Sequence, residues 1–260
     1  MKYSIETILL LIVLFVCCEL FGLFIVSNYY EKNLPYQLRP PQIPSSAIPP
    51  YFLFIILILT MILLLLKRLK MNFVIKIWFF SVLFICAAIS LNVFLESTIA
   101  LVISIILILI RYKYQNYFIH NFTEILCYGG VTALFVPMLN FNSIITLLIL
   151  LSIYDIIAVY VTKHMIKLAE AQREMDIFSG LVIKFKDEYA LLGGGDVAFP
   201  LLFASVALRD FGPLHALLSI YLSTIALVIL VLIGEKKKYY PALPFLASGS
   251  FLGFFIAYLL

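Results

Sequence analysis

The chain has 260 residues, of which 64% are hydrophobic and only 12% are charged. Soluble domains carry about 25% charged residues, so this composition excludes an ordinary soluble globular protein. The net charge of +4 is modest, and the basic residues stand at the ends of apolar runs, which argues against a nucleic-acid partner. Apolar runs of about 20 residues recur along the whole length and predict an all-α, polytopic membrane protein.

The apolar runs predict nine transmembrane helices. We place them at residues 5–26, 51–66, 73–94, 97–110, 118–139, 143–162, 190–208, 213–233 and 239–260. The first is too long for a signal-peptide core and is interpreted as a retained span. The second and fourth look short for a bilayer about 30 Å thick, and the fifth is expected to bend at Gly129, Gly130 and Pro137. We divide the chain into spans one to five, residues 1–142, which are expected to form a scaffold, and spans six to nine, residues 143–260, which hold the acidic residues considered below.

Two connections between the spans are long. Residues 27–50 are rich in proline and predict an extended loop without helix, whereas residues 163–189 are strongly charged. Numbering the connections alternately assigns 15 of the 18 lysines and arginines to the side that holds the N-terminus. Basic connections face the cytoplasm, so we expect a multi-pass protein of the cell membrane with its N-terminus cytoplasmic, its C-terminus outside and residues 163–189 in a cytoplasmic loop.

Acidic residues inside the spans mark the candidate site, because a charge at a helix centre costs about 2.5–3.5 kcal/mol. Asp155 lies eight residues before Lys163, at the end of span six, and Asp196 follows Glu188, at the start of span seven, by eight. These spans are consecutive and antiparallel, so both carboxyls are expected roughly 12 Å from the cytoplasmic surface. No role follows from the sequence for Glu19 in the first span.

Two carboxyls in contact within a desolvated site share one proton, as in aspartic proteases. The ionised member takes a proton from water, and the neutral member donates to the peptide carbonyl. Glycines 193 to 195 would let a substrate backbone approach Asp196 and would let the helix start late or unwind. This chemistry requires no metal and no other cofactor. The same acids could instead line an ion or proton pathway, or join helices in a non-catalytic scaffold, and depth alone does not separate these readings.

Three short motifs resemble those of a known family. YD at 154–155, GGGD at 193–196 and PAL at 241–243 are similar, in order and in span, to the signatures of the GxGD intramembrane aspartyl proteases, which are the presenilins and signal peptide peptidases. The likeness is clear over residues 143–260, and the chain resembles most the presenilin-like proteins of prokaryotes, of the archaeal type. The resemblance implies an aspartic endopeptidase that hydrolyses peptide bonds within the transmembrane segments of membrane proteins.

By this resemblance the catalytic acids are Asp155 and Asp196. The residues that bind substrate or shape the site are Tyr154, Gly193, Gly195, Pro241, Ala242 and Leu243. The implied partners are the transmembrane helices of substrates in the lipid bilayer. The loop between spans six and seven has 27 residues, far fewer than in presenilins, so the likeness does not extend to self-cleavage of that loop. We expect no obligatory partner subunits, and a homo-oligomer stays open.

In residues 181–189, LVIKFKDEY, apolar and polar side chains alternate and β-branched residues are present, which predicts a short strand. A helix must unwind before cleavage, and we hypothesise that this strand pairs with the unwound substrate by strand addition; the alternative is a solvated linker. Pro241 and Pro244 predict a non-helical start for span nine. His120 and Glu124 have i,i+4 spacing and are interpreted as a surface contact rather than a metal site.

Overall fold

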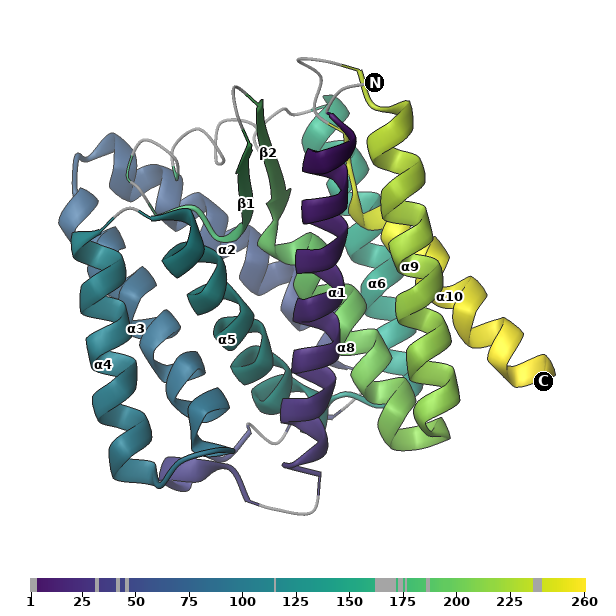
Figure 1. The fold of residues 1–260 in the computed structure, drawn as a ribbon, viewed down its shortest axis with the longest axis horizontal. Helices are drawn as coiled ribbons and strands as arrows, with labels where there is room; N and C mark the ends of the chain where they lie inside the picture. Colours follow the sequence, from purple (N-terminus) through teal and green to yellow (C-terminus); the bar gives the residue numbers. More distant parts are fainter. Residues whose placement is uncertain are drawn as a thin grey trace.

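The computed structural model describes residues 4–30, 33–40, 43–44, 47–114, 116–161, 172, 175, 177–185, 188–235 and 240–260. These residues form nine α-helices, a few short turns of tighter or wider helix, and one β-hairpin (Figure 1). The α-helices are α1 (Ile5–Ser27), α2 (Ile48–Arg68), α3 (Asn72–Asn92), α4 (Ser97–Lys113), α5 (Tyr117–Phe135), α6 (Phe141–Ile156), α8 (Gly194–Phe211), α9 (Pro213–Ile233) and α10 (Leu243–Leu259).

Each predicted span coincides with one of these helices. By length and composition, five described segments could cross a membrane: α1, α2, α3, α6 with the following π-helical turn, and α9. The expectation of a short second span is wrong, because α2 has 21 residues. It begins at Ile48 and holds Pro49 and Pro50 in its first turn, where proline is tolerated. Helix α4, with 17 residues, is short as expected.

The predicted bend in the fifth span is also wrong. Helix α5 runs unbroken through Gly129 and Gly130, and Pro137 stands beyond it in the 3-10 turn η3 (Val136–Met138). The glycines serve close packing instead, since a Cβ atom on Gly130 would overlap the backbone of Cys86 in α3. The proline-rich loop of residues 27–50 is expected from its sequence to lack helix, but its described residues include the 3-10 turn η1 (Pro35–Gln37).

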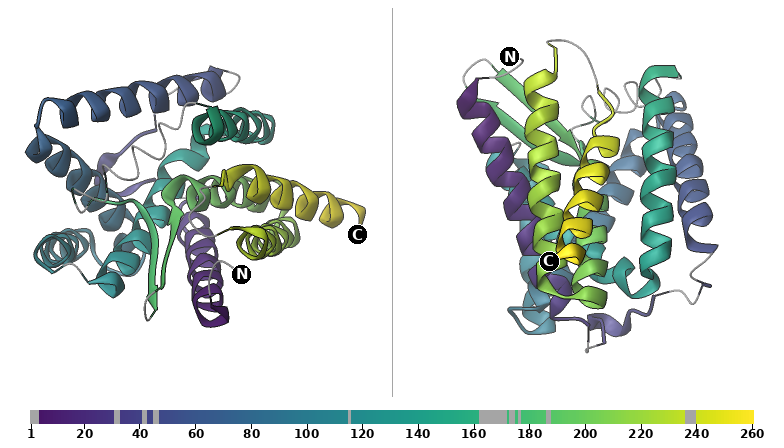
Figure 2. Two further views of the ribbon diagram at one scale, coloured as in Figure 1. Left: turned by 90° about the horizontal axis from the view of Figure 1, so that it is seen from above. Right: turned by 90° about the vertical axis from the view of Figure 1, so that its right-hand side faces the viewer.

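Helices α9 and α10 lie side by side at one edge of the bundle (Figures 1 and 2). Gly249 and Gly253 stand four residues apart on α10, at the spacing that allows two membrane helices to approach closely. A Cβ atom on Gly249 would lie 2.5 Å from the carbonyl oxygen of Leu222 in α9, and one on Gly253 would overlap the carbonyl of Leu218. Two glycines therefore set how near α10 comes to its neighbour.

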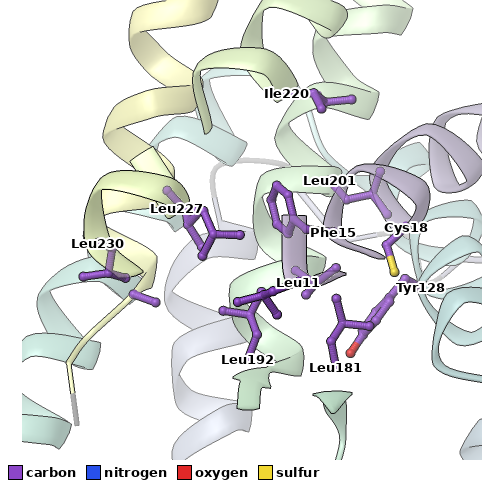
Figure 3. Packing of buried hydrophobic residues seen from close by; sticks show 14 of the residues in the cluster. Leu11, Phe15, Cys18, Tyr128, Leu181, Leu192, Leu201, Ile220, Leu227 and Leu230 are labelled. Carbon is purple, nitrogen blue, oxygen red and sulfur yellow. The ribbon is translucent and has the colours of Figure 1, made fainter. Parts of the chain in front are cut away.

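The largest buried cluster joins the two halves of the chain. Leu11 and Phe15 of α1 pack with Leu181 and Leu192 of the hairpin and with Leu201 of α8 (Figure 3). The hairpin lies at the end of the bundle that also holds the N-terminus (Figure 1). The apolar face of the hairpin is thus seated on α1, which fixes the start of α8 against the bundle. The division into a scaffold of residues 1–142 and a catalytic part of residues 143–260 stays a prediction.

Candidate active site

The β-hairpin leads directly into the GGGD motif. Strand β1 (Gly180–Phe185) pairs antiparallel with β2 (Glu188–Gly193), and Gly180 stands opposite Gly193. The predicted strand is confirmed for residues 181–185, but residues 188 and 189 belong to the second strand, so the segment forms part of a hairpin and not one strand. The seventh span starts at Gly194 and not at residue 190, because residues 188–193 pair with β1 and the Gly194 N–H donates to the Ser179 carbonyl at 3.1 Å.

Asp196 lies in the first turn of α8 and is half-buried. Gly193 is the N-cap residue of the helix, and the Asp196 carboxyl folds back towards it, so that a Cβ atom on Gly193 would lie 3.0 Å from Asp196 Oδ2. The positive end of the helix dipole also favours a carboxylate here. Pro200, four residues further on, has no N–H to bond to the Asp196 carbonyl, so the helix is locally weakened beside this acid.

Asp155 lies in the last turn of α6 and is only 8% exposed. The helix widens immediately after it into the π-helical turn Ile157–Val161. Such turns are rare in proteins and are frequent at functional sites, where they change the direction in which side chains point. Helix α6 packs against both α8 and α10, so Asp155 faces the elements that carry the other two motifs.

The backbone N–H of Leu243 connects the two acids. It donates to the Asp155 Oδ2 atom at 3.4 Å, and it lies close enough to the Asp196 carboxyl to act on that group together with the charge of Asp155. Helix α10 begins at Leu243 rather than at residue 239, so the predicted non-helical start is confirmed for Pro241 and is wrong for Pro244, which lies in the first turn of the helix. Residues 236–239 lie outside the described part of the chain. The structure thus brings Asp155, Asp196 and the PAL motif together.

The three glycines of GGGD have different surroundings. A Cβ atom on Gly193 would lie 3.0 Å from the Asp196 Oδ2 atom, and one on Gly194 would lie 2.8 Å from the Ser179 hydroxyl. Gly195 is exposed, and a Cβ atom there would meet only the Phe199 ring, at an ordinary 3.4 Å. Packing therefore favours glycine most at Gly194, a methyl group at Gly193 would press on the Asp196 carboxyl, and the position of Gly195 is open apart from Phe199.

The remaining predicted site residues flank the acids. Tyr154 is half-buried, and its hydroxyl bonds to the side chain of Thr60 in α2. Pro241 contributes to an apolar groove of about 600 Å³ between α6, α9 and α10. The groove begins beside Asp155, since the next residue, Ile156, is part of its wall. Glu19 is fully buried in α1, and its carboxyl has no hydrogen-bond partner within the described residues.

The reading of His120 and Glu124 as a surface contact is wrong. Glu124 is fully buried and forms an ion pair with Arg111 at 2.8 Å, while His120 and Asn121 bond to the backbone of β1. The sequence did hold one signal, because Glu124 is an acid within an apolar run. No group of three or more metal-ligating side chains gathers in the part of the chain that the structure describes.

Comparisons with known proteins show the family of the chain and its fold. The model of the family described as signal-peptide peptidase, presenilin aspartyl protease matches residues 12–260. A solved structure of a presenilin family intramembrane aspartate protease in space group C222 superposes with a TM-score of 0.73, at 23% identity, covering 97% of this chain and 98% of the other. A second such structure, in space group P2, gives 0.69 at 22% identity, covering 96% of each chain. No curated protein sequence matches.

The likeness to the solved structures shows a shared fold, and the family match spans nearly the whole chain. The chain therefore belongs to the family of signal-peptide peptidases and presenilin aspartyl proteases, and it is a multi-pass membrane protein with the activity of an intramembrane aspartic endopeptidase.

Proposed function

We propose that Asp155 and Asp196 are the catalytic pair with which this protease hydrolyses peptide bonds inside the transmembrane segments of membrane proteins. The observation that carries the proposal is the position of the Leu243 N–H, which donates to the Asp155 carboxyl at 3.4 Å and lies near the Asp196 carboxyl as well. Two carboxyls that approach the same N–H converge, and converging carboxyls that are partly removed from water hold one proton between them.

The shared proton defines the roles of the pair. The ionised carboxylate accepts a proton from a water molecule as the water oxygen bonds to the peptide carbonyl carbon. The neutral carboxyl donates its hydrogen bond to the carbonyl oxygen and stabilises the tetrahedral intermediate. Collapse of the intermediate breaks the C–N bond and transfers a proton to the leaving amine. Either aspartate can start as the base.

The apolar groove is suited to the flanks of a transmembrane substrate. Its wall includes Pro241, Pro244 and Phe245 at the start of α10, together with Ile156 beside Asp155. A substrate helix has apolar side chains all round, and such side chains gain little by leaving lipid unless they fit a shaped surface. We assign Pro241, Ala242 and Leu243 the role of shaping this approach, and Tyr154 the role of fixing α6 to α2 through Thr60.

Unwound substrate backbone requires new hydrogen-bond partners in the membrane. Strand β2 ends at Gly193, three residues from Asp196, so a substrate strand added to β2 would run towards the acids. Gly195 supports this role, because its open surroundings leave room for a second backbone.

The distribution of basic residues supports a cytoplasmic location for the N-terminus and for the hairpin, which lie at the same end of the bundle (Figure 1). The C-terminus is then outside. Digestion of a terminal tag by an external protease, in sealed vesicles of known orientation, tests this topology. An N-terminal tag cleaved from the outside would reverse the assignment.

The decisive experiment uses purified protein in lipid vesicles with a single-span reporter substrate and no other protein. Asp155→Asn and Asp196→Asn should each abolish new fragments, whereas Asp210→Asn, the same change at an exposed ion pair, should leave cleavage intact. Fragments that persist in both active-site variants would remove the assignment. Ion flux across the vesicles without any fragments would favour a conducting pathway, and activity that required an added subunit would contradict a self-sufficient enzyme.

A further inference from the structure

Polar side chains of α5 cover the outer edge of strand β1. The Asn121 side chain acts like a neighbouring strand: its carbonyl oxygen accepts from the Val182 N–H at 2.9 Å, and its amide nitrogen donates to the Val182 carbonyl at 2.7 Å. Two residues earlier in β1, the Gly180 N–H donates to Glu124 at 3.1 Å, and His120 Nε2 donates to the Gly180 carbonyl at 2.8 Å. Both backbone groups of alternate β1 residues are therefore already bonded.

A buried ion pair holds this row in place. Arg111 of α4 bonds to Glu124 at 2.8 Å, to the Thr123 hydroxyl at 2.6 Å and to the Phe178 carbonyl at 3.3 Å. Arg111 is 6% exposed and Glu124 is fully buried. A charge in such a place is costly to leave unpaired, so α4, α5 and the start of β1 are joined as one unit.

The covered edge decides which side of the hairpin is open. In an antiparallel pair, residues alternate between those that exchange bonds with the partner strand and those whose backbone groups point away. Gly180 and Val182 point towards α5, so Leu181 and Ile183 exchange bonds with Leu192 and Ala190 of β2. Leu191, opposite Val182, then directs its N–H and C=O away from β1, along the outer edge of β2.

We propose that His120, Asn121 and Glu124, which we call the α5 row, together with Arg111 of α4, which holds Glu124 in place, are positioning residues that set where the substrate is cut. By bonding to Gly180 and Val182, the row prevents a substrate strand from pairing with the outer edge of β1. It also fixes the position of the hairpin along α5, and hence its position relative to Asp196. Because Gly180 pairs with Gly193, three residues before Asp196, a shift of β1 along α5 moves the β2 edge relative to the acids. The inference rests on strand addition to β2, proposed above.

Asn121→Leu tests the row, because leucine has a similar size and neither hydrogen-bonding group. The measurement is mass spectrometry of the fragments from the single-span reporter, with the thermal midpoint recorded alongside. We expect the dominant cleavage position to lose its preference, by about tenfold relative to neighbouring bonds, which corresponds to one net hydrogen bond. Thr132→Val is the matched control: it lies buried in the same helix, and its hydroxyl bonds only to carbonyls of α5.

Asn121→Asp allows a measurement whose result would not change if Asn121 only stabilised the fold, namely how the ratio of cleavage positions depends on pH. The ionised side chain accepts from the Val182 N–H but repels its carbonyl, whereas the protonated side chain can accept from one and donate to the other, as asparagine does. The ratio of cleavage positions should therefore return towards that of the unchanged protein as the pH falls, whatever happens to the total rate. Unchanged cleavage positions in both folded Asn121 variants, or a ratio in Asn121→Asp that ignores pH, would overturn the proposal. Absence of any fragments from the unchanged protein would instead count against the proposed function.

Discussion

The backbone N–H of Leu243 donates to a carboxylate oxygen of Asp155 at 3.4 Å, although the two residues stand 88 positions apart in the chain. Leu243 is the first residue of α10, so its N–H has no partner within its own helix. The helix start thus supplies a donor to the acids, and the prolines on either side of Ala242 and Leu243 keep the chain from extending the helix past that donor.

Leu243→Pro should remove this donor while α10 is retained, because proline is accepted at the first position of a helix. Loss of a hydrogen bond to a charged group is worth about 1.5–3 kcal/mol, so kcat should fall roughly 10- to 100-fold below that of Leu243→Ala. Alanine keeps the N–H and loses the same buried side chain, which makes it the matched control. Equal rates for the two variants would show that the donor does not contribute.

Gly194→Ala and Gly195→Ala should separate packing from substrate approach. At Gly194 the added methyl group meets the Ser179 hydroxyl at 2.8 Å, so we expect a loss of about 1–3 kcal/mol in stability, seen as a lower thermal midpoint. At Gly195 the methyl group has room, so the midpoint should stay unchanged while kcat/KM falls. Full activity in a stable Gly195→Ala variant would contradict close approach of substrate backbone at this position.

The buried ion pair between Arg111 and Glu124 should be costly to break from one side. Arg111→Met leaves an uncompensated carboxylate and is expected to lower the free energy of unfolding by about 3–5 kcal/mol. The double variant Arg111→Met with Glu124→Leu should recover part of this loss. Recovery will be incomplete, because the Gly180 N–H then loses its acceptor. Chemical unfolding in micelles gives the free energy of unfolding of the unchanged protein, of Arg111→Met and of the double variant. A double variant no more stable than Arg111→Met would refute this account.

Gly253→Ala should move α10 away from α9. The added methyl group overlaps the Leu218 carbonyl, and backbone cannot yield as a side chain can. We expect both the thermal midpoint and the cleavage rate to fall, since α10 carries Leu243 to the acids. Ser248→Ala on the same helix is the control, because that exposed hydroxyl bonds only to the Pro244 carbonyl one turn earlier. A normal cleavage rate in a destabilised Gly253→Ala protein would show that the contact between α9 and α10 does not affect the active site.

The sequence by itself predicted the membrane class, the nine helices found among the described residues and a similar depth for Asp155 and Asp196. These follow from local properties. The length of an apolar run indicates a transmembrane span, and the number of residues from the end of that span gives the depth of a side chain in the membrane. The sequence misplaced the helix starts at Gly194 and Leu243. In both places, contacts with distant residues replace the expected first helical turn, because residues 188–193 pair with β1 and the PAL segment turns towards Asp155.

Only the tertiary structure decided which polar groups meet across distant helices. Asn121 and Val182 stand 61 positions apart, and nothing in their spacing indicates that a side-chain amide replaces a strand. Likewise, the sequence alone suggests that Glu124 is a surface acid, whereas in the structure Arg111 of α4 lies 2.8 Å from it. Such pairs depend on how helices pack and rotate, and that is settled by the fit of many side chains at once rather than by any short stretch of sequence.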